Sequence, residues 1–503
     1  VYKRQLDTSD PASVGRFRIS HGNILDDLVL IRKDILNEPQ LAERIKRKYR
    51  IKNTCGYALN SFVDYNDPID ILAHLMIGSE GTLGFVSNAR LETINSYSHR
   101  ATALIFFPDL KTGTRAVIRW SKSNSANAAE LWDGPSLKAM ANLPEAPSIV
   151  KGLETDACGV LIEARAEDEG TLRQKVSSLV EAIKDLETLG SYEFYTDEER
   201  CEALWAFRRA QFPAIAGARE PNELVIIEDV CFPIDRIEEG CKEFGKLFKR
   251  YGYEGGVHGH AFHGNFHFAL PVDMSSELER SKVHAFLEEM MHIVLKLDGS
   301  LKAEHGTGYA VAPFVELEWG TKLYSIMQRV KRLLDPEGIL NPGVLLNDDP
   351  KCHIKNLKNP MASHPKLDNC VECGFCEPVC PSEQIGFSPR QRVSVWRYIS
   401  HLRATAPEKV KDWEKQYDTL GTELCATDGI CTTKCPLQVD VAGFVKERRA
   451  QMATKSSKKI AHSVGSHLGS TTRGAAHLLN GVALFQRLLG LSLIHISEPT
   501  RPA

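Results

Sequence analysis

The chain has 503 residues, of which 43% are hydrophobic, and its formal net charge is −3. These values predict a globular protein of two to four domains. A near-neutral balance gives no electrostatic reason to expect nucleic-acid binding, which needs a basic face. No stretch reaches the roughly 18 consecutive apolar residues of a membrane-spanning helix.

The two ends of the chain differ in character from the rest. "VYKRQ" at residues 1–5 and "SLIHISEPTRPA" at 492–503 resemble translated sequencing adapter more than protein that was selected to fold. Ordinary disordered tails are the alternative. We expect both ends to be non-native and the chain to be an internal fragment of a longer protein, and we exclude both ends from the fold prediction.

Hydrophobic periodicity predicts the helices and strands in chain order. "PQLAERIKRKY" at 39–49 has the spacing of a surface helix, and the apolar run at 85–94 is typical of a strand. From 96 to 272, runs such as "ATALIFF", "CGVLIEA" and "ELVIIEDVCF" alternate with helices such as 170–189. This alternation predicts an α+β domain with an antiparallel sheet. Amphipathic helices are expected at 275–297 and 321–334, and at most an amphipathic helix at 475–491.

Seven of the thirteen cysteines lie between residues 370 and 435, and the other six are scattered singly. Clustered cysteines without a secretory signal predict metal chemistry in a reducing compartment. The first group has C-x2-C-x2-C-x3-C spacing before Pro381 and comprises Cys370, Cys373, Cys376 and Cys380. This is the ferredoxin spacing, in which three thiolates bind one 4Fe-4S cluster and the fourth binds the other. A zinc knuckle is the alternative, but zinc sites usually pair two separated C-x2-C units.

A second cysteine group, "CATDGICTTKCP", has Asp428 where a middle cysteine is expected. By the crossover rule, the first cluster takes Cys370, Cys373, Cys376 and Cys435. The second cluster takes Cys380, Cys425 and Cys431, completed either by an Asp428 oxygen or by an open iron; Asp428 could also be a turn residue. Because the segment between the groups has a helical pattern, we predict an α-helical ferredoxin domain at 367–452, after a polar linker at 348–366.

"GSEGTLG" at 78–84 is a glycine-rich loop between apolar runs, which lets backbone N–H groups approach phosphate. A tight turn would also need glycine. Together with "KNTCGYALN" at 52–60, "IEDVCFP" at 227–233 and "LDPEGILNPG" at 334–343, the loop resembles the FAD-linked oxidase family of the vanillyl-alcohol-oxidase fold. The closest resemblance is to its respiratory FAD and iron–sulfur D-lactate dehydrogenases, and it extends over about residues 17–448.

The resemblance implies the second half of a FAD-binding domain at 17–95 and a C-terminal substrate domain at 96–347. In the family, the first half of the FAD domain precedes this segment, so we expect the chain by itself to bind FAD poorly. The FAD-binding residues that the resemblance implies are Asn53, Thr54, Gly56, Tyr57, Gly78, Ser79, Glu80, Gly81, Thr82, Leu83, Gly84 and Asn341.

The family oxidises D-2-hydroxy acids, and Arg208 matches its arginine for the substrate carboxylate. A guanidinium fork suits a carboxylate, although an arginine on a helix is more often only solvated. Relatives acting on 2-hydroxyglutarate carry a lysine in the strand equivalent to 226–233, where this chain has none. We therefore expect D-lactate as the substrate, with glycolate and D-2-hydroxyglutarate as alternatives.

"GHAFHGNFHF" at 259–268 and "KAEHGTG" at 302–308 are the candidate catalytic segments. A hairpin with surface histidines is the alternative for the first. In the family the two segments meet at the flavin, which implies a divalent metal (Zn, Mn or Fe) on His260, His267 and Glu304. His305 would then be the base that takes the hydroxyl proton.

The expected cofactors are FAD, two 4Fe-4S clusters and the divalent metal, with a quinone or cytochrome as electron acceptor. The expected location is the cytoplasm, with peripheral association at the inner face of the membrane as an option. A non-catalytic iron–sulfur electron-transfer subunit is the rival interpretation, and the hydroxy-acid motifs argue against it.

Overall fold

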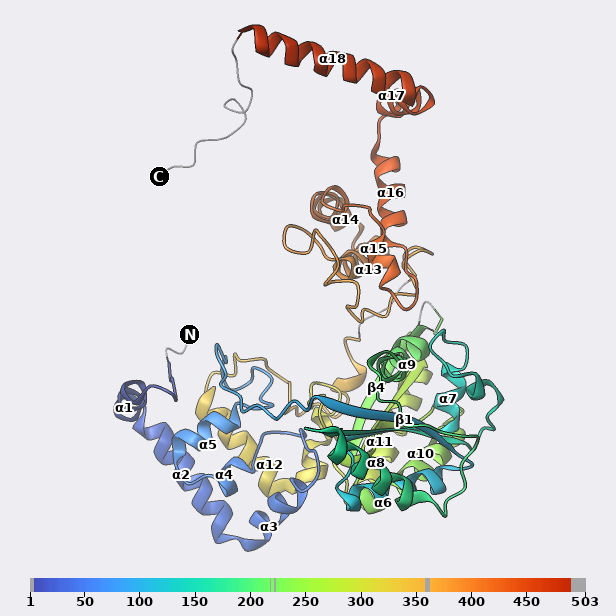
Figure 1. Cartoon of the computed structure of the whole chain (residues 1–503). Helices are drawn as coiled ribbons and strands as arrows, with labels where there is room; N and C mark the ends of the chain where they lie inside the picture. Colours follow the sequence, from blue (N-terminus) through green and yellow to red (C-terminus); the bar gives the residue numbers. More distant parts are fainter. Residues whose placement is uncertain (1–3, 218, 221–222, 358–361, 490–503) are drawn as a thin grey trace. The chain divides into compact units, whose positions relative to one another are not determined.

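The computed structural model describes residues 4–217, 219–220, 223–357 and 362–489. The first of two compact units comprises the chain up to Cys373 with Ser400–Thr405, and the second comprises Gly374–Ile399 with the chain from Ala406 onward (Figure 1). Residues 1–3 and 492–503 of the expected non-native ends, and residues 358–361 of the expected linker, lie outside the described residues.

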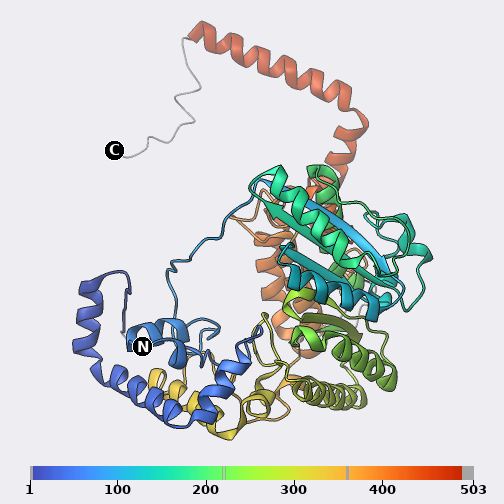
Figure 2. The same ribbon diagram turned by 60° about the horizontal axis from the view of Figure 1, so that its bottom comes forward.

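The first unit begins with a group of helices that includes the predicted surface helix, now seen as α3. Their bounds are α1 Pro11–Ser20, α2 Gly22–Asn37, α3 Pro39–Lys48, α4 Ser61–Asp64 and α5 Pro68–Leu75. Helix α2 lies beside α12 (Val315–Leu334) in both views (Figures 1 and 2). Arg329 of α12 joins them through an ion pair with Asp34 at 2.7 Å. The N-terminal helices therefore pack against a segment almost 300 positions further along the chain.

The predicted strand at 85–94 is wrong. These residues have no regular secondary structure, and Phe85 and Ile94 are 92% and 95% exposed. A strand needs a neighbour to satisfy its backbone N–H and C=O groups, and none of the described strands pairs with this segment. The apolar run alone did not contain that information.

In the described part of the chain, six strands form one sheet in the order β1-β3-β2-β5-β6-β4, and every neighbouring pair is antiparallel. This confirms the predicted α+β class, and the three predicted strands are β1, β3 and β4. The bounds are β1 His99–Phe107, β2 Ala128–Trp132, β3 Cys158–Ala166, β4 Leu224–Cys231, β5 His258–His260 and β6 Asn265–Val272.

Helices cover both faces of the sheet. One face is covered by α6 (Leu110–Ser123), α8 (Glu169–Ile183), α10 (Ile237–Tyr251) and α11 (Glu277–Lys296) (Figure 1). The other face carries α7 (Gly134–Met140) and α9 (Glu198–Gly217). The predicted helices at 170–189 and 275–297 correspond to α8 and α11. The helix predicted at 321–334 is the part of α12 that follows a kink at Gly320, where φ is 76°.

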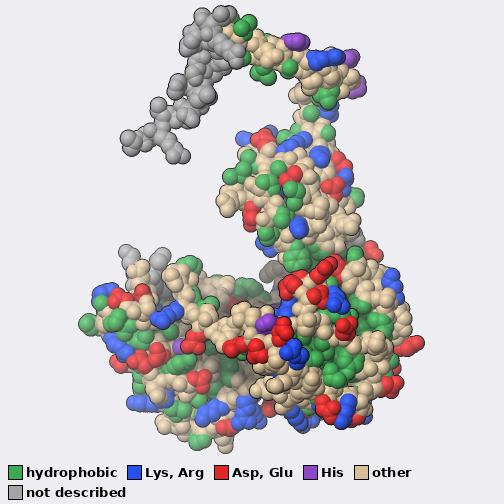
Figure 3. All heavy atoms as spheres, in the orientation of Figure 1, with side chains coloured by type: hydrophobic (Ala, Val, Ile, Leu, Met, Phe, Trp, Pro, Cys, Tyr) green, Lys and Arg blue, Asp and Glu red, His purple; other side chains and the backbone are tan. Residues whose placement is uncertain are grey.

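The second unit is helical, as predicted for the ferredoxin domain. It contains most of α13 (Pro389–Thr405), followed by α14 Pro407–Tyr417, a π-helical turn Asp418–Glu423, α15 Ile430–Thr433, α16 Val441–Met452, α17 Lys455–Ser466 and α18 Leu468–Leu489. Helix α18 includes residues 475–489 of the amphipathic segment expected at 475–491, and residues 490–491 lie outside the described residues. Among the helices that the structure describes, none combines the length and hydropathy needed to cross a bilayer. Acidic and basic side chains are interspersed on the face of the first unit shown in Figure 3.

Candidate active site

A tight hairpin brings the histidines of 259–268 onto the sheet. Strands β5 and β6 are joined by a 3-10 turn that ends at Gly264, where φ is 64°. A Cβ at this position would lie 1.8 Å from the carbonyl oxygen of Phe232, so only glycine fits. This geometry places His260 at the end of β5 and His267 within β6.

The register of the sheet aligns the polar residues of four strands. Glu130 of β2 lies opposite His260, and His267 lies opposite both His258 and Asp229. Neighbouring residues in antiparallel register project from the same face, so these side chains converge. Glu130 is bonded to Arg208 of α9, which places the site on the face covered by α9.

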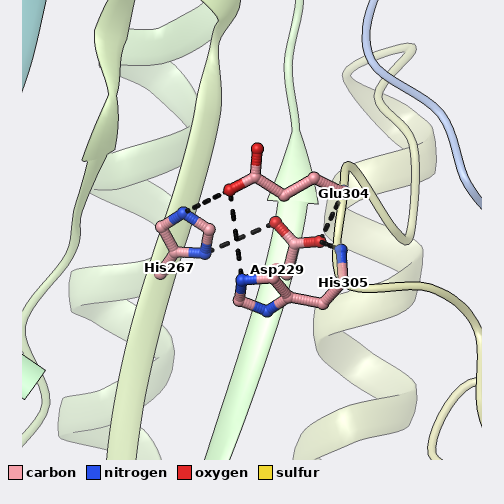
Figure 4. A group of neighbouring side chains, drawn as sticks. All are labelled: Asp229, His267, Glu304 and His305. Carbon is pink, nitrogen blue, oxygen red and sulfur yellow. Dashed lines mark hydrogen bonds and ion pairs between the residues drawn. The ribbon is translucent and has the colours of Figure 1, made fainter. Parts of the chain in front are cut away.

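Asp229 positions the second catalytic segment. Its Oδ2 accepts hydrogen bonds from the backbone N–H groups of Glu304 and His305 at 2.7 and 2.8 Å (Figure 4), and from that of Ala303 at 3.1 Å. Its Oδ1 accepts a fourth from Asn265 Nδ2 at 2.6 Å. Burial alone would raise the pKa of Asp229, but the N–H donors of His305 and Glu304 lower it overall. The ionised carboxylate therefore holds the 303–305 backbone beside β4.

The predicted metal ligands meet around one oxygen of Glu304. Its Oε1 lies 3.1 Å from His260 Nε2 and 3.4 Å from His267 Nε2. Ligand atoms held about 2.0–2.1 Å from a tetrahedral zinc ion are about 3.3–3.4 Å apart, and the two separations from Glu304 Oε1 are close to this value. The set His260, His267 and Glu304 offers two imidazoles and a carboxylate, which are side chains that bind divalent metals.

A second combination of ligands is also close together. Ligand atoms of Asp229, His267, Glu304 and His305 all lie within 4.8 Å of one another (Figure 4). However, both oxygens of Asp229 are already used by N–H donors, as described above. We therefore assign Asp229 to the positioning of the loop; His267 and Glu304 are common to this group and to the predicted ligand set.

Glu130 orients His260 and was missed at the level of sequence. Its Oε1 lies 2.6 Å from His260 Nδ1, which leaves Nε2 to face Glu304. Hydrogen bonds that the carboxylates of Glu130 and Glu304 accept from its ring raise the pKa of His260 to about 9. The hydrogen bond between Glu304 and His260 is the main cause that holds the pKa of Glu304 far below its ordinary value, and the hydrogen bond with His267 is the next. The signal that could have revealed Glu130 is a lone carboxylate inside the apolar strand "AAELW".

His305 has the properties of a general base. Its ring stacks on that of His267, with centroids 4.8 Å apart, and its side chain is 46% exposed. Burial lowers the pKa of His305, and the attraction of Asp229 only partly opposes this effect. The imidazole is therefore neutral at neutral pH and able to accept a proton.

Arg208 lies next to this group, as expected for a carboxylate-binding residue. Its Nε donates to Glu130 Oε2 at 2.7 Å, and its side chain is 19% exposed. Within the described residues it has no other hydrogen bond, so the two Nη groups keep their donors for a ligand. Lys52, a second basic group that the sequence prediction missed, donates to Glu304 Oε2 at 2.6 Å.

The expected flavin loop offers an open backbone surface. Gly78 and Gly81 have φ of 71° and 72°, and no atom lies within 4 Å of a Cβ built on either residue. Glu80 of this loop accepts N–H bonds from Thr307 at 2.7 Å and Gly308 at 3.0 Å. The glycine-rich loop is thereby attached to the segment that carries Glu304 and His305.

Most of the other residues expected to bind FAD contact groups within the protein instead. Asn53 Nδ2 donates to Glu318, the hydroxyls of Tyr57 and Thr82 are 2.7 Å apart, and Asn341 Nδ2 donates to the Glu80 carbonyl. Three more of these residues are buried, namely Ser79, Thr82 and Leu83, and Gly84 is half-buried. Hydrogen bonds also join Thr54 to Gly306 and Gly56 to Thr307. These residues therefore shape the loop, and the exposed glycine backbone remains for a phosphate.

The cysteines of the second unit form part of a separate cavity. Cys380, Cys425 and Cys431 line it together with Asp428, which are the ligands expected for the second cluster. The three sulfurs and a carboxylate suit an iron–sulfur cluster, which thiolates bind. Asp428 Oδ1 also accepts a hydrogen bond from the backbone N–H of Ile430 at 3.1 Å. Asp428 therefore stabilises this turn whether or not it also binds iron. Of the first set, Cys370 and Cys373 belong to the first unit, and Cys376 and Cys435 to the second.

Comparison with known proteins identifies a domain family in each of two parts of the chain. Residues 97–345 match the model of the FAD linked oxidases, C-terminal domain, and residues 366–439 match the 4Fe-4S dicluster domain. The chain is 29% identical to a mitochondrial D-lactate dehydrogenase (cytochrome) of Arabidopsis thaliana, over 66% of this chain and 54% of that protein.

Two further relatives differ in their substrates. Glycolate oxidase subunit GlcD of Bacillus subtilis is 26% identical over 55% of this chain and 58% of its own length. D-2-hydroxyglutarate dehydrogenase of Haemophilus influenzae is 22% identical over 77% of this chain and 44% of its own length. The chain thus spans about half the length of these relatives. It joins a C-terminal domain of the FAD-linked oxidase family, at residues 97–345, to a 4Fe-4S dicluster domain at residues 366–439.

Proposed function

We propose that the protein oxidises a D-2-hydroxy acid with FAD and passes the electrons through two 4Fe-4S clusters. The observation that carries this proposal is the convergence of His260, His267 and Glu304 beside a neutral His305, on a loop attached to Glu80. An electron-transfer subunit without catalysis would have no use for this group.

Each residue then has one chemical role. His260, His267 and Glu304 would hold a divalent ion, which when bound supplies Lewis-acid chemistry. The Nη groups of Arg208 bind the substrate carboxylate as a fork. His305 takes the hydroxyl proton on its neutral ring. Bound FAD would supply the two-electron acceptor, and the clusters would supply a one-electron path.

D-lactate is the substrate that we propose first. A dicarboxylate would need a second cation, and β4 reads "LVIIEDVC" without a lysine. The nearby Lys302 is buried and already paired with Glu228 at 2.9 Å. Such a buried pair is costly to break, so Lys302 is a poor candidate for a second carboxylate.

D-2-hydroxyglutarate is the second candidate. Its dehydrogenase from Haemophilus influenzae matches 77% of this chain, against 66% for the Arabidopsis D-lactate enzyme. The deciding experiment compares kcat/KM for D-lactate, D-2-hydroxyglutarate and glycolate, with the full-length protein and an artificial electron acceptor. A tenfold preference for D-2-hydroxyglutarate would overturn the lactate assignment, and bleaching of the flavin by none of the three acids would overturn the oxidation itself.

For the redox partners we propose two clusters, a quinone or cytochrome acceptor, and a cytoplasmic location with contact to the inner face of the membrane. The relatives named as cytochrome-linked enzymes support the acceptor class. Reduction of cytochrome c and of a soluble quinone by the full-length protein distinguishes the two acceptors, and cell fractionation tests the location.

A further inference from the structure

Arg392 of α13 lies at the cavity that contains the second set of cysteines. Its side chain is 1% exposed, and it lines this cavity together with Cys380, Cys425, Asp428 and Cys431. Its Nε donates to the carbonyl oxygen of Gly421 at 2.8 Å, and its Nη1 donates to the sulfur of Cys380 at 3.8 Å. Its Nη2 is buried and has no hydrogen-bond partner among the described residues.

This arrangement is costly in the protein without its cluster. A guanidinium stays charged under all ordinary conditions, and a buried charge is expensive unless an opposite charge compensates it. Within the described part of the chain, Arg392 forms no ion pair with a carboxylate, and the nearest acidic group lining the cavity, Asp428, is hydrogen-bonded to Ile430. Thiolates and an anionic iron–sulfur cluster are the negative charges that this position can meet.

We infer that Arg392 is a positioning residue for the second cluster: it donates to the Cys380 thiolate and holds a fixed positive charge against the cluster. The inference rests on the proposal of two clusters. Reduction adds one electron, delivered from the reduced flavin, and a nearby cation stabilises the more negative form. Hydrogen bonds to the sulfurs and local charge are the features that set cluster potentials. Arg392 therefore raises the reduction potential of this cluster.

The test is an EPR-monitored redox titration of the anaerobically reconstituted chain and its Arg392→Gln and Arg392→Lys variants. In Arg392→Gln we expect the ratio of reduced to oxidised second cluster, at a fixed potential, to fall about tenfold, which corresponds to about 59 mV for one electron. Arg392→Lys keeps the charge but not the two directed donors, so its ratio should fall about threefold. The matched control is Arg390→Gln in the same helix, a half-buried arginine paired with Glu377 at 3.0 Å, which should leave the ratio unchanged.

The outcomes separate this inference from the proposal beneath it. If the wild-type chain holds only about four irons, there is no second cluster and the inference about Arg392 fails with it. A chain with about eight irons, in which Arg392→Gln has the wild-type potential, overturns the inference alone. The signal of the first cluster reports whether the Gln variant has folded. If that signal is lost, the Arg392→Lys variant is titrated instead. A wild-type potential of the second cluster in that variant would overturn the role of Arg392.

Discussion

Lys52 Nζ lies 2.6 Å from Glu304 Oε2, while the other oxygen of the same carboxylate faces His260 and His267. The two sides of Glu304 are therefore divided between a basic side chain and the predicted metal ligands. Lys52 and Glu304 are 30% and 32% exposed, so solvent weakens this ion pair and it contributes little to stability. Its effect is to orient Glu304 so that Oε1 stays available for a metal ion.

His260→Ala should remove metal binding. The variant loses one of the three ligands, so the affinity for Mn²⁺ or Zn²⁺ should fall by more than the roughly 100-fold typical of losing an outer partner. Isothermal titration calorimetry on the metal-free chain measures this loss. The control is His263→Ala, from the same hairpin and without an assigned role. Equal affinity in His260→Ala and wild type would remove His260 from the site.

Glu130→Gln should weaken the same metal by about 10–100-fold, because the charge that orients His260 is lost although all three ligands remain. The matched control is Glu163→Gln, a buried glutamate on the neighbouring strand β3 that is bound to Arg165 at 2.6 Å. Metal titrations of the two variants under the same conditions measure the two affinities. Glu130 has no positioning role if both variants bind as wild type does.

Glu80→Ala should destabilise the chain by about 2 kcal/mol, because the N–H groups of Thr307 and Gly308 lose a charged acceptor. Urea unfolding of the chain measures the free energy. Glu80→Gln keeps one acceptor oxygen and should lose less than the alanine variant. Identical unfolding midpoints for all three proteins would show that the glycine-rich loop and the 306–308 segment are not coupled.

Asp428→Cys should change the EPR signal and the potential of the second cluster while the chain keeps about eight irons. Asp428→Asn keeps the shape and the acceptor for Ile430 N–H, so it separates a ligand from a turn residue. If the aspartate serves only the turn, both variants behave as wild type and the ligand role is refuted. Tightly bound zinc in place of iron would contradict the whole iron–sulfur assignment.

His353 should make the chain less stable in mild acid. Burial, with repulsion from His284 as a smaller cause, lowers the pKa of His353 from 6.5 to about 4. The unfolded chain therefore takes up a proton below about pH 6.5, while the folded chain does so only near pH 4. Stability should fall as the pH drops through this window and be unaffected by His353 above it.

The measurement is the urea midpoint of wild type and His353→Gln at pH 7 and pH 5. The difference between the two pH values should shrink in the variant. Because His462 is exposed, His462→Gln controls for the loss of an imidazole elsewhere in the chain. An unchanged difference in His353→Gln would rule His353 out as the source.

Local patterns predicted much of the fold. The sequences of β1, β3 and β4 are apolar runs, and α11 and α3 have clear helical spacing, so their types could be predicted from short segments. The strands β2 and β5 are too short to give such a signal: β2 has five residues and β5 only the three residues His258–His260. The run at 85–94 failed for the converse reason: its composition suits a strand, but pairing depends on distant residues.

The candidate site was predictable only in part. His260, His267, Glu304 and His305 came from motifs and a family resemblance, and the structure brings them together. Glu130 and Lys52 are distant in sequence from both motifs; Lys52 begins the "KNTCGYALN" stretch, but nothing there indicated a contact with Glu304. Their roles depend on strand register and on packing between elements, which a single sequence does not display.

Lys48 and Glu318 form a buried ion pair at 3.4 Å, with exposures of 4% and 0%. Glu318 also accepts the N–H of Leu301 and the side-chain amide of Asn53, and one hydrophobic core runs from Phe17 to Leu345. A protein cut at residue 96, where the family model begins to match, would leave Glu318 buried without its cation, at a cost of several kcal/mol. We therefore expect residues 97–345 to be less stable by themselves than together with the helices that precede them.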